Sequence, residues 1–137
     1  MTIDDYLDAV TRWPLDDYGG HRGGVDCVLF LANWIRETCG RDPAADLRGT
    51  YSTQAEARAI LEKAGGFIPL VTCRLANIGW RGVSDPETGD VAIVSVRAGP
   101  GKHVQMPAIH RRGLWLFPDR RRLVAGRFHP LLIWRQA

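Results

Sequence analysis

The chain has no long apolar run and no N-terminal targeting pattern. Within its 137 residues, no segment approaches the roughly 18–20 consecutive apolar residues that a membrane-spanning helix needs. Residues 1–6 are acidic and polar, whereas a signal peptide has a basic start followed by an apolar stretch. We therefore expect synthesis in the cytoplasm and no membrane span.

Cysteine is scarce, and its spacing suggests no pairing. The three cysteines are Cys27, Cys39 and Cys73, and no two of them form a C-x-x-C pair. An odd number without such a pair argues against a disulfide framework and against a structural zinc site. We expect no metal and no cofactor. Cys39 and Cys73 are predicted to be buried as small apolar residues.

The composition is that of one globular domain. Apolar residues make up 45% of the chain and charged residues 24%, which are ordinary values for a soluble protein. The net charge is +3, and its arginines gather in the last third, as at 111–112 and 120–122. A solvated surface is the expected reading of this charge. Because no nucleic-acid fingerprint accompanies it, we expect no nucleic-acid partner.

Capping signals and apolar spacing predict helices in the first 80 residues. Thr2 with Asp5, and Thr53 with Glu56, have the spacing of capping boxes. Asp26 has the character of an N-cap before an apolar helix at about 27–38 that Gly40 ends. Apolar residues at three- and four-residue steps favour a further short helix over 67–78.

The chain changes character after residue 84. A turn at 85–90 precedes a β-branched run at 91–96, and the segments 103–109, 113–117 and 131–135 are expected as further strands. Helices followed by antiparallel strands predict one α+β domain over residues 1–137. Its helical half covers about 1–80 and its β half 89–137.

Cys27 stands where helix geometry can change thiol chemistry. A helix N-terminus carries roughly half a positive charge, which stabilises a thiolate. The thiol pKa can then fall from about 8.5 towards roughly 3.5–7.5. Cys27 is therefore the candidate nucleophile of this sequence.

A nucleophilic cysteine needs a base, and histidine is the usual one. His103 is our first choice, because a strand-borne histidine facing a helix-borne cysteine is the papain-like arrangement. His21, in the glycine-rich loop, stays an alternative. His110 is expected in a solvated hairpin turn, and His129 at the entry to the last strand.

Four segments together resemble the NlpC-like cell-wall cysteine peptidases. They are the loop Tyr18-Gly19-Gly20, the Gly24-Val25-Asp26-Cys27 helix start, the strand Gly89-Asp90-Val91-Ala92-Ile93-Val94, and His103-Val104. The order and separation of these segments match the order of the family's motifs.

This resemblance implies a papain-like, NlpC-type fold with N-terminal helices packed on a C-terminal antiparallel sheet or small barrel. It implies hydrolysis of amide bonds in the stem peptides of peptidoglycan. Cys27 would be the nucleophile and His103 the general base. Tyr18 and Asp26 would lie at the oxyanion and substrate site, where the backbone N–H of Cys27 could donate to the oxyanion.

The chain also resembles small proteins of phage and prophage tail modules. Asp42-Pro43-Ala44-Ala45-Asp46-Leu47-Arg48-Gly49 and the terminal Trp134-Arg135 carry this likeness. It implies other phage tail proteins as partners and a place in the virion tail.

Two departures from the family keep other functions open. Val28-Leu29 replaces the family's Ser-Gly, and Gln105-Met106-Pro107 interrupts the histidine strand. The first alternative is a catalytically inactive NlpC-like domain that serves as a structural or interaction component of a tail tip. Another cysteine hydrolase or acyltransferase, and a nucleic-acid-binding domain, are the remaining alternatives.

Overall fold

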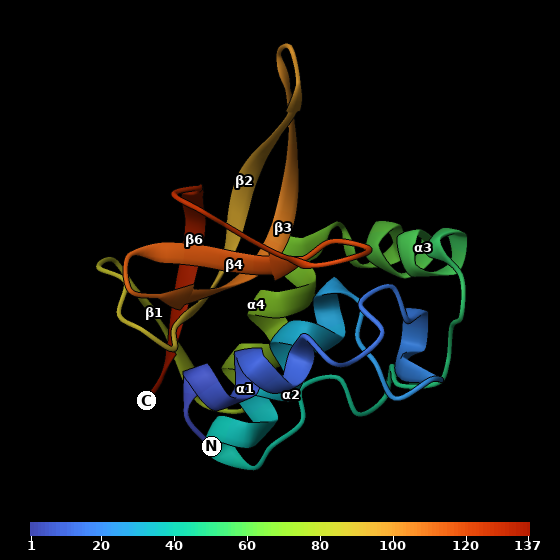
Figure 1. Cartoon of the computed structure of the whole chain (residues 1–137), viewed down its shortest axis with the longest axis horizontal. Helices are drawn as coiled ribbons and strands as arrows, with labels where there is room; N and C mark the ends of the chain where they lie inside the picture. The colour runs from blue at the N-terminus through green and yellow to red at the C-terminus, as the bar shows by residue number, and fades with distance from the viewer.

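The chain folds as an α+β domain, described by a computed structural model of residues 1–137 (Figure 1). Four α-helices come first: α1 (Ile3–Val10), α2 (Cys27–Cys39), α3 (Gln54–Ala64) and α4 (Phe67–Asn77), with a 3₁₀ turn, η1 (Tyr18–Gly20), before α2. Six strands follow: β1 (Trp80–Val83), β2 (Val91–Gly99), β3 (Lys102–Arg111), β4 (Leu114–Pro118), β5 (Leu123–Gly126) and β6 (His129–Gln136). They form one antiparallel sheet in the order β1-β6-β2-β3-β4-β5.

The predicted starts of the four helices are confirmed, and a side chain caps α1, α2 and α3, whereas α4 begins without a side-chain cap. Thr2 and Asp5 form a capping box, and the hydroxyl of Thr53 accepts from the N–H of Glu56 at 3.1 Å. Gly40 ends α2 in the left-handed conformation that favours glycine. None of the helices is long and apolar enough to cross a membrane.

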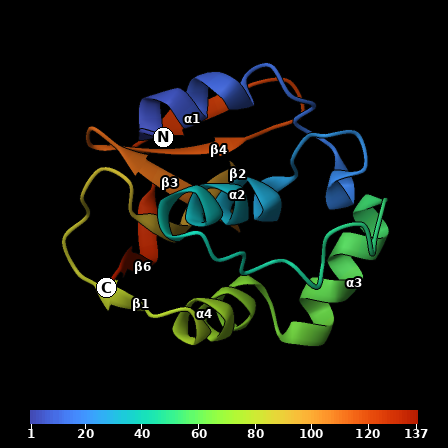
Figure 2. The same ribbon diagram turned by 90° about the horizontal axis from the view of Figure 1, so that it is seen from below.

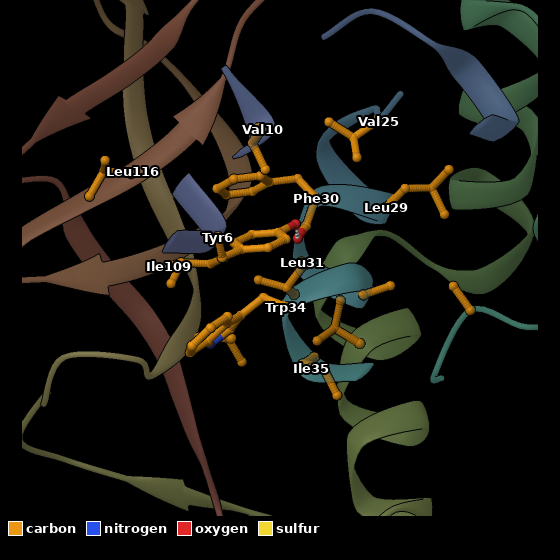
Figure 3. Close-up of a cluster of buried hydrophobic side chains, with 14 of the residues drawn as sticks. Tyr6, Val10, Val25, Leu29, Phe30, Leu31, Trp34, Ile35, Ile109 and Leu116 are labelled. Carbon is orange, nitrogen blue, oxygen red and sulfur yellow. Dashed lines mark hydrogen bonds between the residues drawn. The ribbon is translucent and has the colours of Figure 1, made fainter. Parts of the chain in front are cut away.

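Helix α2 lies at the centre of the molecule, between the sheet and α4 (Figure 2). Its buried face meets Tyr6 of α1, whose hydroxyl donates to the carbonyl of Phe30 at 2.5 Å (Figure 3). The indole N–H of Trp34 donates to the carbonyl of Gly89 at 2.8 Å, which ties α2 to the turn before β2. These contacts fix α2, and with it Cys27, against the sheet.

The β2–β3 hairpin extends beyond its neighbours and projects from the body of the molecule (Figure 1). Strand β6 pairs with β2 only as far as Ser95, and β4 pairs with β3 only from Ile109. Residues 96–104 therefore pair only with each other, and residues 105–108 of β3 pair only with β2. Pro107 lies in this part of β3, where its missing N–H breaks no pairing with a further strand.

The sequence analysis did not predict two of the strands. β1 and β5 have four residues each and form the two edges of the sheet. β1 begins at Trp80, at the end of the predicted helical half, and its other residues lie between the two predicted halves. Neither segment is long enough to show a clear alternation, and pairing with β6 and with β4 defines them.

Two predictions of burial are wrong. Cys73 is exposed, because it lies on the outer face of α4, and Cys39 is half-buried. His110 is buried, with 6% of its surface exposed, where a solvated turn was expected. β3 continues one residue past His110, and its ring packs edge-on against Trp115 with the centroids 4.8 Å apart.

The buried His110 predicts a loss of stability in mild acid. Burial lowers the pKa of His110 below its ordinary value. The unfolded chain therefore takes up a proton near pH 6.5 that the folded protein resists, so the free energy of unfolding falls as the pH drops below about 6.5.

Urea unfolding between pH 7 and pH 5 measures this slope, and His110→Gln should flatten it. Asp42 and Asp46, whose pKa values are lowered by arginine partners, respond only in more acidic solution. An unchanged slope in His110→Gln would contradict the assignment.

Candidate functional site

Cys27 is the first residue of α2, and Asp26 before it is the N-cap. One carboxylate oxygen of Asp26 accepts from the N–H of Leu29 at 2.8 Å. The predicted helix start is therefore confirmed. It positions the thiol beside the free N–H groups of the first turn, as the sequence indicated.

The other carboxylate oxygen of Asp26 holds the neighbouring loops. It accepts from the N–H of Gly19 at 3.2 Å and from the hydroxyl of Tyr51. With 5% of its surface exposed, Asp26 is buried among these donors. Burial raises the pKa of Tyr51, and the Asp26 carboxylate raises it further, so the tyrosine stays a hydrogen-bond donor. Asp26 thus acts as a structural anchor in this site.

The glycine-rich loop before α2 is tied down as well. The carboxylate of Asp17 accepts from the N–H groups of Arg22 and Gly24, both at 2.8 Å. At Gly24, a Cβ atom would lie 2.2 Å from the carbonyl oxygen of Pro14. The loop therefore needs glycine here to pass close to Pro14, in the segment that follows α1.

Two hollows reach Cys27. The inner hollow lies between α2, α3 and α4 and is almost wholly apolar; its lining residues are Tyr18, Asp26, Cys27, Val28, Leu47, Tyr51, Ala57, Ile60, Leu61 and Leu70. The outer hollow lies between the start of α2, β3 and the end of β4; its lining residues are Leu15, Asp16, Tyr18, Asp26, Cys27, Met106, Pro118, Asp119 and Arg120. Tyr18, Asp26 and Cys27 are thus brought together in both hollows.

The thiol of Cys27 is not activated in this environment. Burial raises its pKa to about 12, and the negative charge of Asp26 raises it as well. Hydrogen bonds from the backbone N–H groups of Val28 and Cys27 favour the thiolate, but their effect is smaller. Near neutral pH the cysteine is therefore a protonated thiol.

No histidine lines either hollow that reaches Cys27. His103 instead lines a separate hairpin hollow, whose lining residues are Ser95, Val96, Arg97, His103, Arg127, Phe128, His129 and Leu131. His21 donates from Nε2 to the carbonyl oxygen of Tyr51 at 2.7 Å, and His110 is packed on Trp115. The structure thus brings Cys27 together with Tyr18 and Asp26, and it places His103 in a different hollow.

The register of the hairpin explains where His103 lies. His103 pairs with Arg97 near the tip, and Met106, which lines the outer hollow, pairs with Val94. Three residues along a strand correspond to about 10 Å, and an odd separation places the two side chains on opposite faces of the sheet. The β3 residue beside Cys27 is therefore Met106.

Sequence reasoning missed Tyr51 and Met106. Tyr51 lies in a loop without periodicity, and no local signal pairs it with Asp26. Met106 had a signal, because it belongs to Gln105-Met106-Pro107, the run that departs from the family's histidine strand. No group of three or more histidine, cysteine or acidic side chains is arranged to hold a metal ion.

Together these features define an α+β protein with a half-buried cysteine at the N-terminus of its central helix. The chain belongs to the DUF6950 family, described as a domain of unknown function, whose model matches residues 2–135. No curated protein and no solved structure matches the chain.

Proposed function

We propose that this protein is a catalytically inactive NlpC-like domain that serves as a structural or interaction component of a phage tail tip. One observation carries the proposal: neither hollow at Cys27 contains a histidine, and the residue that β3 contributes to the outer hollow is Met106. A thiol with a pKa of about 12 and no base to take its proton is a poor nucleophile.

The roles of the neighbouring residues support the same reading. Asp26 accepts three hydrogen bonds, from Leu29, Gly19 and Tyr51, and all of them stabilise the local fold. Val28 and Leu47 contribute apolar side chains to the inner hollow. This arrangement fits a papain-like fold in which the cysteine at the helix start serves packing. The resemblance to proteins of phage tail modules is the basis for proposing a tail tip as its location.

A cysteine peptidase acting on peptidoglycan stem peptides is the second candidate. The backbone N–H groups of Cys27 and Val28 at the helix start favour this candidate, because their hydrogen bonds to the sulfur stabilise the thiolate. In that case His103 would be the base, and the hairpin would have to carry it to Cys27.

Thiol labelling tests the proposal directly. With iodoacetamide at pH 7.5, we expect the exposed Cys73 to react first and Cys27 last, because burial keeps the Cys27 thiol protonated. Labelling of Cys27 should rise as the pH is increased towards 12. Peptide mass spectrometry assigns each site, and Cys73→Ser removes the fast reaction as a control. Labelling of Cys27 ahead of Cys73 near neutral pH would contradict the proposal.

A hydrolysis assay separates the two candidates. Purified muropeptides are incubated with the unmodified protein, with Cys27→Ser and with His103→Ala, and the products are followed by chromatography. We expect no release of cleaved stem peptide by any of the three proteins. Cleavage that disappears in both variants would establish the peptidase.

A further inference from the structure

The hairpin hollow carries positive charge that nothing in the chain neutralises. Arg97 and Arg127 line it beside His103 and His129, and neither arginine forms an ion pair. The hollow contains no acidic residue, and Asp119 is the only acidic residue after position 90. Three of the other six arginines of the β half pair with acids: Arg111 and Arg112 with Asp4, and Arg135 with Asp90.

Register places the polar groups of the hollow on one face of the sheet. Residues directly opposite each other in an antiparallel pair have side chains on the same face. Arg97 is opposite His103, and Ser95 is opposite His129. Arg97 and His103, towards the tip of the hairpin, therefore lie on the same face as Ser95 and His129, where β6 stops pairing with β2.

Apolar side chains are also exposed near the hollow, and Val104, which follows His103 in β3, lies on the opposite face of the hairpin from Arg97 and His103. Three of the five large hydrophobic residues that the protein exposes are Val104, Leu131 and Leu132, with 38–43% of their surface accessible. Leu131 lines the hollow and lies at the bulge where the pairing of β6 with β2 shifts register. A ligand that covers this surface would therefore need apolar groups as well as negative charge.

Unpaired strand edges complete the surface. β4 pairs with β3 only at residues 109–111, so the outer edge of β3 from Lys102 to Ala108 has no neighbouring strand. Likewise, β2 has no neighbour other than β3 beyond Ser95. A free edge of this kind can accept an added strand from another chain.

We propose that the β2–β3 hairpin and the hairpin hollow bind an extended, acidic segment of a partner protein. Carboxylates of the segment would pair with Arg97 and Arg127, its aliphatic side chains would cover Leu131 in the hollow and Val104 on the opposite face of the hairpin, and its backbone would add to a free edge. A nucleic acid fits the surface less well, because the hollow has no tyrosine or tryptophan for base stacking, and Phe128 packs against Phe117. The inference rests on the proposed function, since it names the partner chemistry of an interaction domain.

Fluorescence anisotropy with defined probes tests this surface. The probe is a labelled peptide of alternating glutamate and valine, and the comparison probes are alternating lysine and valine, alternating glutamate and glycine, and an oligothymidine. We expect saturable binding of the glutamate–valine peptide, weaker binding of the glutamate–glycine peptide and none of the lysine peptide. Binding should weaken as salt is added, because charge pairing at an exposed surface is screened.

A matched pair of double variants locates the binding. Arg97→Glu/Arg127→Glu should weaken binding by about tenfold or more, because it replaces attraction with repulsion. Arg58→Glu/Arg81→Glu makes the same change of charge at exposed arginines on α3 and β1 and should change it by less than about twofold. Thermal unfolding confirms that both variants are folded.

Three outcomes would overturn the inference: no saturable binding of the glutamate–valine peptide, equal weakening in the two double variants, or tighter binding of the oligothymidine that the Arg97/Arg127 variant abolishes. These outcomes are distinct from a failure of the proposed function. Cleavage of muropeptides would refute the inactive site without changing peptide binding at the hairpin.

Discussion

Gly19→Ala is expected to lower the free energy of unfolding by more than about 3 kcal/mol and to open the site around Cys27. Gly19 has a φ of +82°, and a Cβ atom there would lie 1.9 Å from the carbonyl oxygen of Tyr51. That oxygen belongs to the backbone and cannot turn away as a flexible side chain would. The Tyr51 segment must therefore move, and its hydroxyl bond to Asp26 and its carbonyl bond with His21 are at risk.

Gly23→Ala is the matched control. Gly23 has a φ of +75° in the same loop, but no atom lies within 4 Å of a Cβ placed there. It should cost only the backbone strain of an alanine in the left-handed region, about 1 kcal/mol. Urea unfolding gives both free energies, and iodoacetamide labelling of Cys27 should become faster in Gly19→Ala alone. Equal losses in the two variants would show that the close approach to Tyr51 has no energetic weight.

The helical half was predictable because its signals are local. Thr2, Asp26 and Thr53 each satisfy backbone N–H groups within three residues of themselves. Gly40 and Gly65 adopt the left-handed conformation that ends a helix. A sequence window contains these signals, so the starts of α1, α2 and α3 and the ends of α2 and α3 follow from it.

The sheet was only partly predictable, because pairing decides what short segments become. β2 is β-branched and buried along its first four residues, and its own sequence predicts a strand. β1 contains Arg81 and Gly82 and is a strand through its pairing with β6. His110 was assigned to a solvated turn because the sequence does not show that β3 extends past it.

The site also contains residues that local sequence signals place and residues that only tertiary contacts place. The position of Cys27 depends on the helix that it begins, so the sequence could place it. The position of His103 depends on the turn at the hairpin tip and on the pairing that sets it opposite Arg97. Tyr51 comes from a loop about 25 residues away in sequence, where it donates to Asp26. Contacts of this kind require the tertiary fold.

Asp26→Ala is expected to lower the free energy of unfolding by about 2–4 kcal/mol. Losing the cap of α2 accounts for about 1 kcal/mol. The rest comes from the hydroxyl of Tyr51, which would be left buried without its acceptor. Thr53→Ala, which removes an exposed cap from α3, should cost only about 1 kcal/mol. A loss no larger than that of Thr53→Ala would show that the Tyr51 contact contributes nothing.

A double-mutant cycle with Tyr51→Phe measures that contact separately. If the hydroxyl bond to Asp26 contributes as argued, the double variant loses less stability than the sum of the two single variants. The thiol gives an independent readout, because the negative charge of Asp26 raises the pKa of Cys27. Asp26→Asn removes that charge and keeps an oxygen acceptor, so labelling of Cys27 at a fixed pH should become faster. Unchanged labelling would mean that burial alone keeps the thiol protonated, and that the charge of the N-cap Asp26 does not raise the pKa of Cys27.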